Sequence, residues 1–349
     1  MHSLGIDLST DPKKVWLCQI DWDQSPPRVV SLERLTDLPD PRLEGSELDE
    51  RPLVRDQHGL VAALVERLVA FAPGEGRVVG IDAPFGWPVA FVEAVSNWEA
   101  GDLQGFRKRP ELRLRATDRF VQATSGVTPL SVSVDRIGST AMLCVEVLSR
   151  YARRLDAPKI DRARALSGVA EVYPAAALRL WTADDGRQLQ AASYKTSAPA
   201  REELLLQVAG ILQDELGGEV EQLPGYGEAG VCIPVELRAP MLHHDDAFDA
   251  FLCALVARAV ALGTCLTIDR DVHAAQLYLR TPAALDLPAT HDRVQRARQL
   301  QLEAQAAADA EGWVHIPAAG TIRASLGLEP GQVMPGAGSA EPADAVLAA

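Results

Sequence analysis

Gly5-Ile6-Asp7-Leu8-Ser9, near the start of the chain, places an aspartate at the end of an apolar run that includes a β-branched residue. Such a run predicts a buried strand, and open α/β sheets build their sites where strands of this kind end. Gly80-Ile81-Asp82-Ala83-Pro84-Phe85-Gly86 repeats the arrangement further along the chain. The two stretches predict an α/β fold in which Asp7 and Asp82 end two strands.

A third acidic stretch, His244-Asp245-Asp246-Ala247-Phe248-Asp249-Ala250, has the pattern of a helix start. Asp246 and Asp249 are three residues apart, so a helix directs both carboxylates to one side. Capping of the helix N-terminus is the structural alternative, and Asp245 is the best candidate for the cap. Asp249 lies one turn further in, where capping does not explain an acid, so we interpret it as a ligand.

The sequence between these stretches predicts the topology of the sheet. Three strands joined by turns rich in Pro, Asp and Ser indicate an antiparallel meander, and a helix and a further strand follow them. The order βββαβ is characteristic of the ribonuclease H-like fold. The expected strands are residues 3–8, 14–22, 28–35 and 77–81, and the expected helix is residues 58–71.

The remainder of the chain predicts helices, further strands and insertions. We expect residues 1–263 to form a core with insertions, residues 264–329 to pack on it as an extension, and residues 330–349 to be disordered. The expected helices are in residues 112–155 and at 175–181, 200–216, 245–262 and 292–308, and the expected strands are at 168–173, 231–233 and 313–316. A glycine-rich insertion covers residues 217–230.

Composition limits the function. The 349 residues carry a formal net charge of −14, which opposes a general electrostatic grip on nucleic acid, so any such contact must be local. Residues 107–119 are the clearest basic stretch. The five cysteines show no C-x-x-C spacing and indicate neither a zinc site nor disulfides. No signal peptide or membrane-spanning run is evident, which predicts a cytoplasmic protein without a membrane partner.

The chain resembles the family catalogued as domain of unknown function 429, described as predicted nucleases with a ribonuclease H-like fold. The resemblance spans most of residues 3–317. Its motifs, in chain order, are Gly5-Ile6-Asp7, Gly80-Ile81-Asp82-Ala83-Pro84, Arg115-Ala116-Thr117-Asp118-Arg119, Glu171-Val172-Tyr173-Pro174, the His-Asp-Asp helix start, and Glu311-Gly312-Trp313-Val314-His315-Ile316-Pro317.

The acidic helix is also similar to the last helix of bacterial Holliday-junction resolvases, which supplies two metal ligands three residues apart. That similarity implies that Asp7 and Asp82 are the strand ligands. This sequence departs from those resolvases in having Asp82 where they usually have Glu, and in the long insertions between its motifs. Junction specificity therefore does not carry over.

These observations predict a Mg²⁺- or Mn²⁺-dependent nuclease. Asp7, Asp82, Asp246 and Asp249 would hold two metals, because hard cations prefer carboxylate oxygens and paired ions can clamp both reacting oxygens of a phosphodiester. Structural alternatives exist for the strand acids, since Asp7 could cap the bend at residues 9–12 and Asp82 could start a turn.

Other side chains could complete this site. Arg115 and Arg119 could bind a substrate phosphate while Asp118 orients one of them, although ion pairs within a helix explain the same residues. By the family resemblance, Glu171 and Tyr173 could line the same cleft. His244 could join a transition metal, although a hydrogen-bonded histidine near a helix start is commoner. Ser9 belongs to a partial phosphate loop.

Two alternative functions remain open on the sequence. One is nucleotide-dependent phosphotransfer of the actin and sugar-kinase type, for which residues 5–10 would be the first phosphate loop and a convincing second loop is lacking. The other is a noncatalytic binding protein that keeps the acids as structural caps, for which the acidic surface suits a protein partner. Whether the nucleic acid substrate is DNA or RNA is left open.

Overall fold

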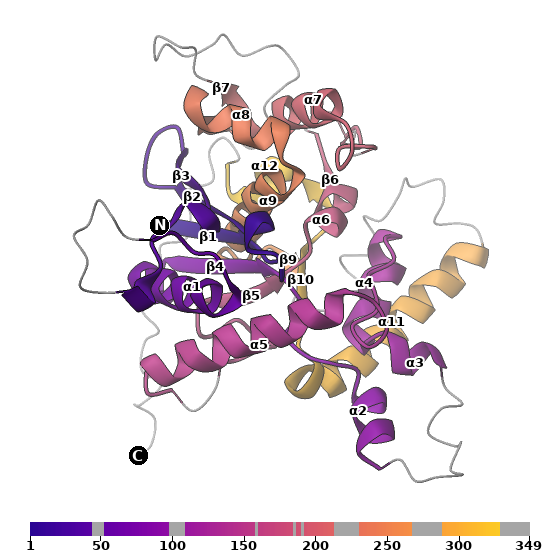
Figure 1. The fold of residues 1–349 in the computed structure, drawn as a ribbon. Helices are drawn as coiled ribbons and strands as arrows, with labels where there is room; N and C mark the ends of the chain where they lie inside the picture. Colours follow the sequence, from indigo (N-terminus) through magenta and orange to yellow (C-terminus); the bar gives the residue numbers. More distant parts are fainter. Residues whose placement is uncertain are drawn as a thin grey trace, which may run out of the picture.

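The structure, a computed structural model, is built on one large mixed sheet (Figure 1). It describes residues 1–43, 52–97, 109–157, 160–183, 186–189, 192–212, 230–266 and 288–328. Nine strands form the sheet in the order β7-β8-β3-β2-β1-β4-β5-β10-β9, and a second sheet pairs β11 with β6. The α/β class predicted from the sequence is confirmed.

The strands of the main sheet are short at its edges and longest at its centre. In chain order they are β1 (His2–Asp7), β2 (Trp16–Asp21), β3 (Arg28–Arg34), β4 (Arg77–Asp82), β5 (Val169–Val172), β7 (Gly210–Leu212), β8 (Val231–Ile233), β9 (Cys265–Leu266) and β10 (Val314–Pro317). The small sheet consists of β6 (Trp181–Thr182) and β11 (Gly320–Thr321).

The predicted meander is confirmed, because β3, β2 and β1 pair antiparallel in that order. β1 then pairs parallel with β4, and β4 pairs parallel with β5. The register of β1 and β4 runs from His2 opposite Arg77 to Asp7 opposite Asp82. The two acids predicted at strand ends are therefore direct neighbours across the sheet.

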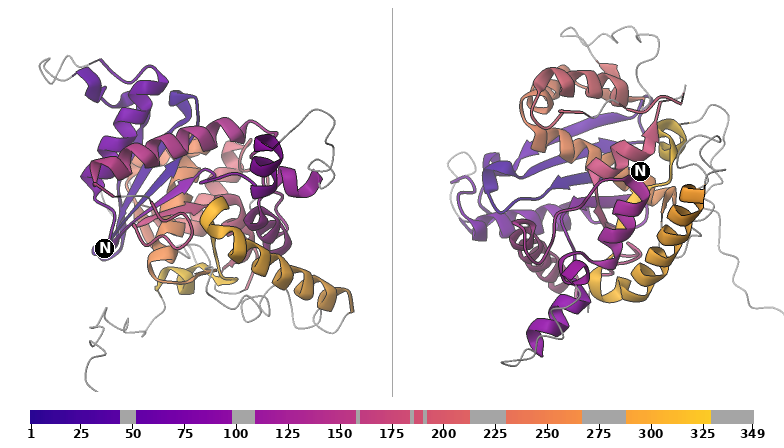
Figure 2. Two further views of the ribbon diagram at one scale, coloured as in Figure 1. Left: turned by 90° about the horizontal axis from the view of Figure 1, so that it is seen from below. Right: turned by 90° about the vertical axis from the view of Figure 1, so that its right-hand side faces the viewer.

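Helices cover both faces of the sheet (Figures 1 and 2). The described helices of at least five residues are α1 (Gln57–Phe71), α2 (Val89–Ser96), α3 (Arg109–Arg113), α4 (Ala116–Ser125), α5 (Ile137–Arg154), α6 (Pro174–Leu180), α7 (Ala198–Ala209), α8 (Val235–His243), α9 (Asp245–Ala261), α11 (Pro288–Glu311) and α12 (Ile322–Leu326). α1 and α5 pack on one face, whereas α9 packs on the other.

Side-chain alternation assigns each strand residue to one of these faces. Leu4 and Ile6 of β1 join the core under α1 and α5. Gly5, between them, points to α9, where an added Cβ would lie 2.0 Å from the Ala250 carbonyl oxygen. Asp7 shares the face of Gly5, so it too lies on the α9 side. The absence of a side chain at Gly5 is what lets α9 approach the sheet this closely.

The same pattern holds in β4. Val79 and Ile81 pack under α1 and α5, and Gly80 faces α9 with the Cys253 carbonyl oxygen 2.7 Å from where a Cβ would lie. Asp82 follows Gly80 on that face. The glycines of the two acidic motifs therefore hold α9 against the strands that carry the acids.

Two expectations about secondary structure need correction. The helix expected over residues 200–216 ends at Ala209, because Gly210–Leu212 pairs in parallel with β8 instead of continuing the helix. The cap expected at Asp245 is also wrong, since α9 begins at Asp245 and the N-cap position is His244. Most of the glycine-rich insertion and the C-terminal tail lie outside the described residues.

The C-terminal extension contributes to the main sheet. β10 lies between β5 and β9, so the predicted strand at residues 313–316 is confirmed and sits inside the sheet, not at its edge. Within the described ranges, no helix has the length and apolar character that a membrane span requires.

Candidate functional site

Asp7 and Asp82 form the centre of the candidate site. They are the last residues of two parallel strands and lie opposite each other in the register. The carboxyl ends of parallel strands are where α/β sheets place their sites. Both acids face α9, which brings in the third acidic stretch.

Asp249 is the α9 acid nearest to full burial, with 1% of its side chain exposed. Its Oδ1 accepts a hydrogen bond of 3.0 Å from the Tyr194 hydroxyl. Its Oδ2 forms an ion pair with the ammonium of Lys195, whose side chain is about half exposed. Both partners come from the turn that precedes α7, a segment to which the sequence pattern assigned no role.

These groups line one cleft of about 290 Å³. This volume lies near the lower limit for small-molecule sites in proteins. The polar side chains that line the cleft are Asp7, Asp82, Arg115, Asp118, Glu171, Tyr173, Tyr194, Lys195 and Asp249. Segments from both ends of the chain, together with its middle, therefore meet at this cleft.

Burial dominates the electrostatics of the cleft. It raises the pKa of Asp7 well above the ordinary value, and the neighbouring Asp82 raises it further while Lys195 opposes the shift. The pKa of Asp82 rises to about 6, again chiefly through burial. The pKa of Asp246 is raised by partial burial and by Asp245. Two adjacent carboxylates with raised pKa values are an arrangement that a bound cation would stabilise.

The carboxylates of the cleft lie further apart than the ligands of a metal ion that is coordinated by three or more side chains. Among the described residues, His2, Asp21 and Asp23 are the group of three side chains whose ligand atoms all lie within 4.8 Å of one another. No three carboxylates of the cleft meet that limit. Asp7 and Asp82 offer the oxygen ligands that Mg²⁺ and Mn²⁺ prefer, and they would hold such an ion together with water.

The His2 group is separate from the cleft and could itself hold a metal ion. It lies at the opposite end of β1 from Asp7. Asp23 already pairs with the N-terminal ammonium, and Asp21 accepts a 3.0 Å bond from the amide of Asp23. Among the described residues, this is the group in which a histidine joins carboxylates at metal-ligand spacing.

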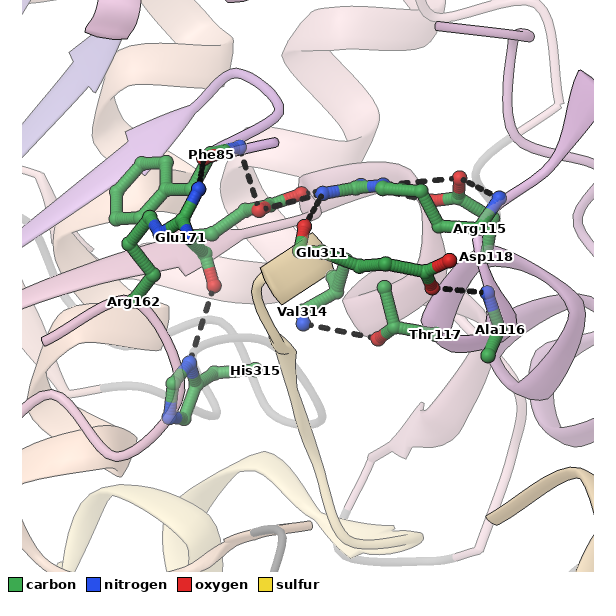
Figure 3. A network of polar contacts seen from close by, with 10 residues as sticks. All are labelled: Phe85, Arg115, Ala116, Thr117, Asp118, Arg162, Glu171, Glu311, Val314 and His315. Carbon is green, nitrogen blue, oxygen red and sulfur yellow. Dashed lines mark hydrogen bonds and ion pairs between the residues drawn. The ribbon is translucent and has the colours of Figure 1, made fainter. Parts of the chain in front are cut away.

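Arg115 is buried beside the cleft and bonds two carboxylates (Figure 3). Its guanidinium reaches Asp118 at 2.7 and 3.0 Å and Glu171 at 2.5 and 2.9 Å. A fifth bond of 3.1 Å goes to the Glu311 carbonyl oxygen. All five guanidinium hydrogens are therefore engaged, which favours a structural role; the phosphate contact expected for Arg115 stays a prediction.

Glu171 links this network to the loop that follows Asp82. Its Oε2 accepts a 2.8 Å bond from the Phe85 amide, while Arg162 donates to the Phe85 carbonyl oxygen at 3.1 Å. The Phe85 backbone is thus held on both sides (Figure 3). Glu171 reaches the site as an acceptor that positions the Asp82 loop, and burial raises its pKa despite the contact with Arg115.

Glu311 closes the network from the C-terminal part of the chain. Its carboxylate accepts bonds from the amides of Val89 at 2.8 Å and Ala116 at 2.6 Å, so one side chain caps the starts of both α2 and α4. His315, four residues later, lies 3.3 Å from the Glu171 carbonyl oxygen. The last motif of the chain therefore braces the elements that surround the cleft.

Of the remaining predicted residues, one lines the cleft and the others have partners elsewhere. Tyr173 lines the cleft, and burial raises its pKa to about 12. Arg119 pairs with Glu303 at 2.9 Å. The centroid of the His244 ring lies 5.3 Å from that of the Trp16 ring. The Ser9 hydroxyl oxygen accepts a hydrogen bond from the Asp11 amide. Asp245 and Asp246 lie at the start of α9 and influence the pKa of Asp7 through their charge.

Sequence reasoning missed Lys195, Tyr194 and Arg162. These residues lie in turns without periodicity, so only their place in the fold reveals them. Glu311 belongs to a motif that is visible in the sequence, but its capping of two helices depends on contacts between distant segments.

A family model described as protein of unknown function (DUF429) matches residues 5–274. The chain belongs to the DUF429 family. All four acids predicted as metal ligands lie within the matched part of this DUF429 protein. No curated protein and no solved structure match the chain.

Proposed function

We propose that this DUF429 protein is a divalent-metal-dependent hydrolase of phosphodiester bonds, a nuclease of ribonuclease H-like architecture. The observation that carries the proposal is the in-register pair Asp7 and Asp82 at the carboxyl ends of parallel strands, facing the acidic start of α9. A divalent ion bound there would supply a polarised water and charge stabilisation at the phosphate.

The chemistry of the donor set supports this proposal. Burial raises the pKa values of Asp7 and Asp82, so both carboxylates are costly to ionise without a cation, and Mg²⁺ or Mn²⁺ would offset that cost. The half-exposed side chain of Lys195 at the cleft would attract a phosphate by its charge. A net charge of −14 makes a local contact of this kind more suitable than a broad basic surface.

The test is a cleavage assay on end-labelled single- and double-stranded DNA and RNA, with Mg²⁺, Mn²⁺ or EDTA. We expect metal-dependent cleavage that Asp7→Asn and Asp82→Asn abolish while circular dichroism shows an intact fold. Asp23→Asn is the matched control, since Asp23 is an acid of the separate His2 group. Full cleavage by Asp7→Asn, or loss of cleavage only in Asp23→Asn, would contradict the proposal.

A further inference from the structure

Asp249 has a cation partner that belongs to the protein. Its two carboxylate oxygens are taken by the Tyr194 hydroxyl and the Lys195 ammonium. A carboxylate this deeply buried requires such partners, because an unpaired buried charge is costly. Asp249 therefore already has, within the protein, the positive partner that a bound metal ion would otherwise supply.

The fold holds Tyr194 and Lys195 in place. Arg201 of α7, itself buried, donates a 2.6 Å bond to the Tyr194 carbonyl oxygen and a 2.8 Å bond to that of Leu242. The Tyr194 ring packs edge-on against Phe248 of α9, with centroids 5.7 Å apart. The position of the Lys195 backbone is therefore set by packing and by a buried arginine.

The charge of Lys195 also acts on the strand acids, because Lys195 lines the same cleft as Asp7 and Asp82. With Asp249, three carboxylates face this one ammonium. The Lys195 ammonium already pairs with Asp249, so it occupies the carboxylate that a second divalent ion would need and repels that ion.

We propose that Lys195 takes the place of a second metal ion, so that the cleft binds one divalent ion at Asp7 and Asp82 while Asp249 stays paired with Lys195. This inference rests on the proposed function and deepens it. It replaces the pair of metals expected from the sequence with one metal and one ammonium. Lys195 is then the residue that sets the metal content of the site.

The test counts bound ions by calorimetric titration of the full chain with MnCl₂ and by native mass spectrometry. All proteins carry Asp23→Asn, so that the His2 group does not add an ion to the count. We expect one Mn²⁺ per chain in this background. In the Lys195→Met variant the count should rise to two, because Asp249 loses its partner and the repulsion of a second cation is removed.

Two further variants sharpen the test. Lys13→Met removes the same charge from an exposed lysine and should leave the count at one. Asp249→Asn should still bind one ion, since Asp249 is not a ligand in this proposal. Asp249→Asn also tests the inference if Lys195→Met fails to fold, because loss of the bound ion in Asp249→Asn would overturn it.

Failure of the inference differs from failure of the proposed function. Two ions in the Asp23→Asn background, or one ion in folded Lys195→Met, would overturn the role of Lys195 and leave a metal-dependent nuclease standing. No ion in that background would overturn both proposals.

Discussion

Replacing Asp82 with Asn should stabilise the metal-free protein. Burial and the neighbouring acid Glu171 raise the pKa of Asp82 from 3.8 to about 6, against the opposing charge of Lys195. At about 1.4 kcal/mol for each factor of ten, ionisation of Asp82 costs the folded state about 3 kcal/mol. Asparagine keeps the shape of the side chain and removes this charge.

The pH dependence follows from the sign of the shift. The folded state binds the proton of Asp82 more tightly than the unfolded state does, so stability falls as the pH rises from 3.8 to about 6 and is level above that range. The advantage of Asp82→Asn should therefore be about 1 kcal/mol near pH 4.5 and about 3 kcal/mol near pH 8.

Urea unfolding in EDTA at these two pH values measures this advantage. Asp23→Asn, which removes an exposed acid outside the cleft, is the control. Saturating Mg²⁺ should reverse the order, because it binds the folded starting protein and not Asp82→Asn. A variant equal to or less stable than the starting protein at pH 8 without metal would refute the reasoning.

Three other substitutions test residues that pack around the site and hold its elements in position. Gly5→Ala should lower the free energy of unfolding by about 3 kcal/mol and weaken Mn²⁺ binding, since its Cβ would meet the Ala250 carbonyl oxygen. Thermal unfolding measures the first effect, and titration with Mn²⁺ measures the second. Glu171→Gln should lower the free energy of urea unfolding by about 1–3 kcal/mol, because its amide cannot accept both bonds from Arg115, although Asp118 remains as an ion partner; an unchanged free energy of unfolding would contradict this role. Burial lowers the pKa of His315 to about 4, so stability should fall by about 3 kcal/mol as the pH drops from 6.5 to about 4. Urea unfolding of His315→Gln should lack that loss, and an unchanged pH profile would count against it.

The strands that carry the site could be predicted because their signal is local. An apolar run that ends in an acid marks both β1 and β4, and the turns between the first three strands specify the meander. The pairing of Asp7 with Asp82 then follows from the parallel register, which two motifs of equal length favour. The helix start at Asp245 was equally visible.

The partners of these acids could not be predicted, because they depend on contacts between distant segments. Lys195 meets Asp249 across 54 positions, and Glu311 caps α4 across 195. Arg115 looked available for a phosphate in sequence, yet the fold surrounds it with acceptors. Similarly, Gly210–Leu212 forms a strand because β8 lies beside it, which helical periodicity does not reveal.

The most direct test of the account is the anomalous scattering of a crystal soaked in Mn²⁺. We infer that Asp7 and Asp82, which are remote in sequence, bind one ion in the cleft beside Lys195. We predict a peak in contact with a carboxylate oxygen of each of these two acids. A peak confined to His2, Asp21 and Asp23, or none in the cleft, would contradict the account.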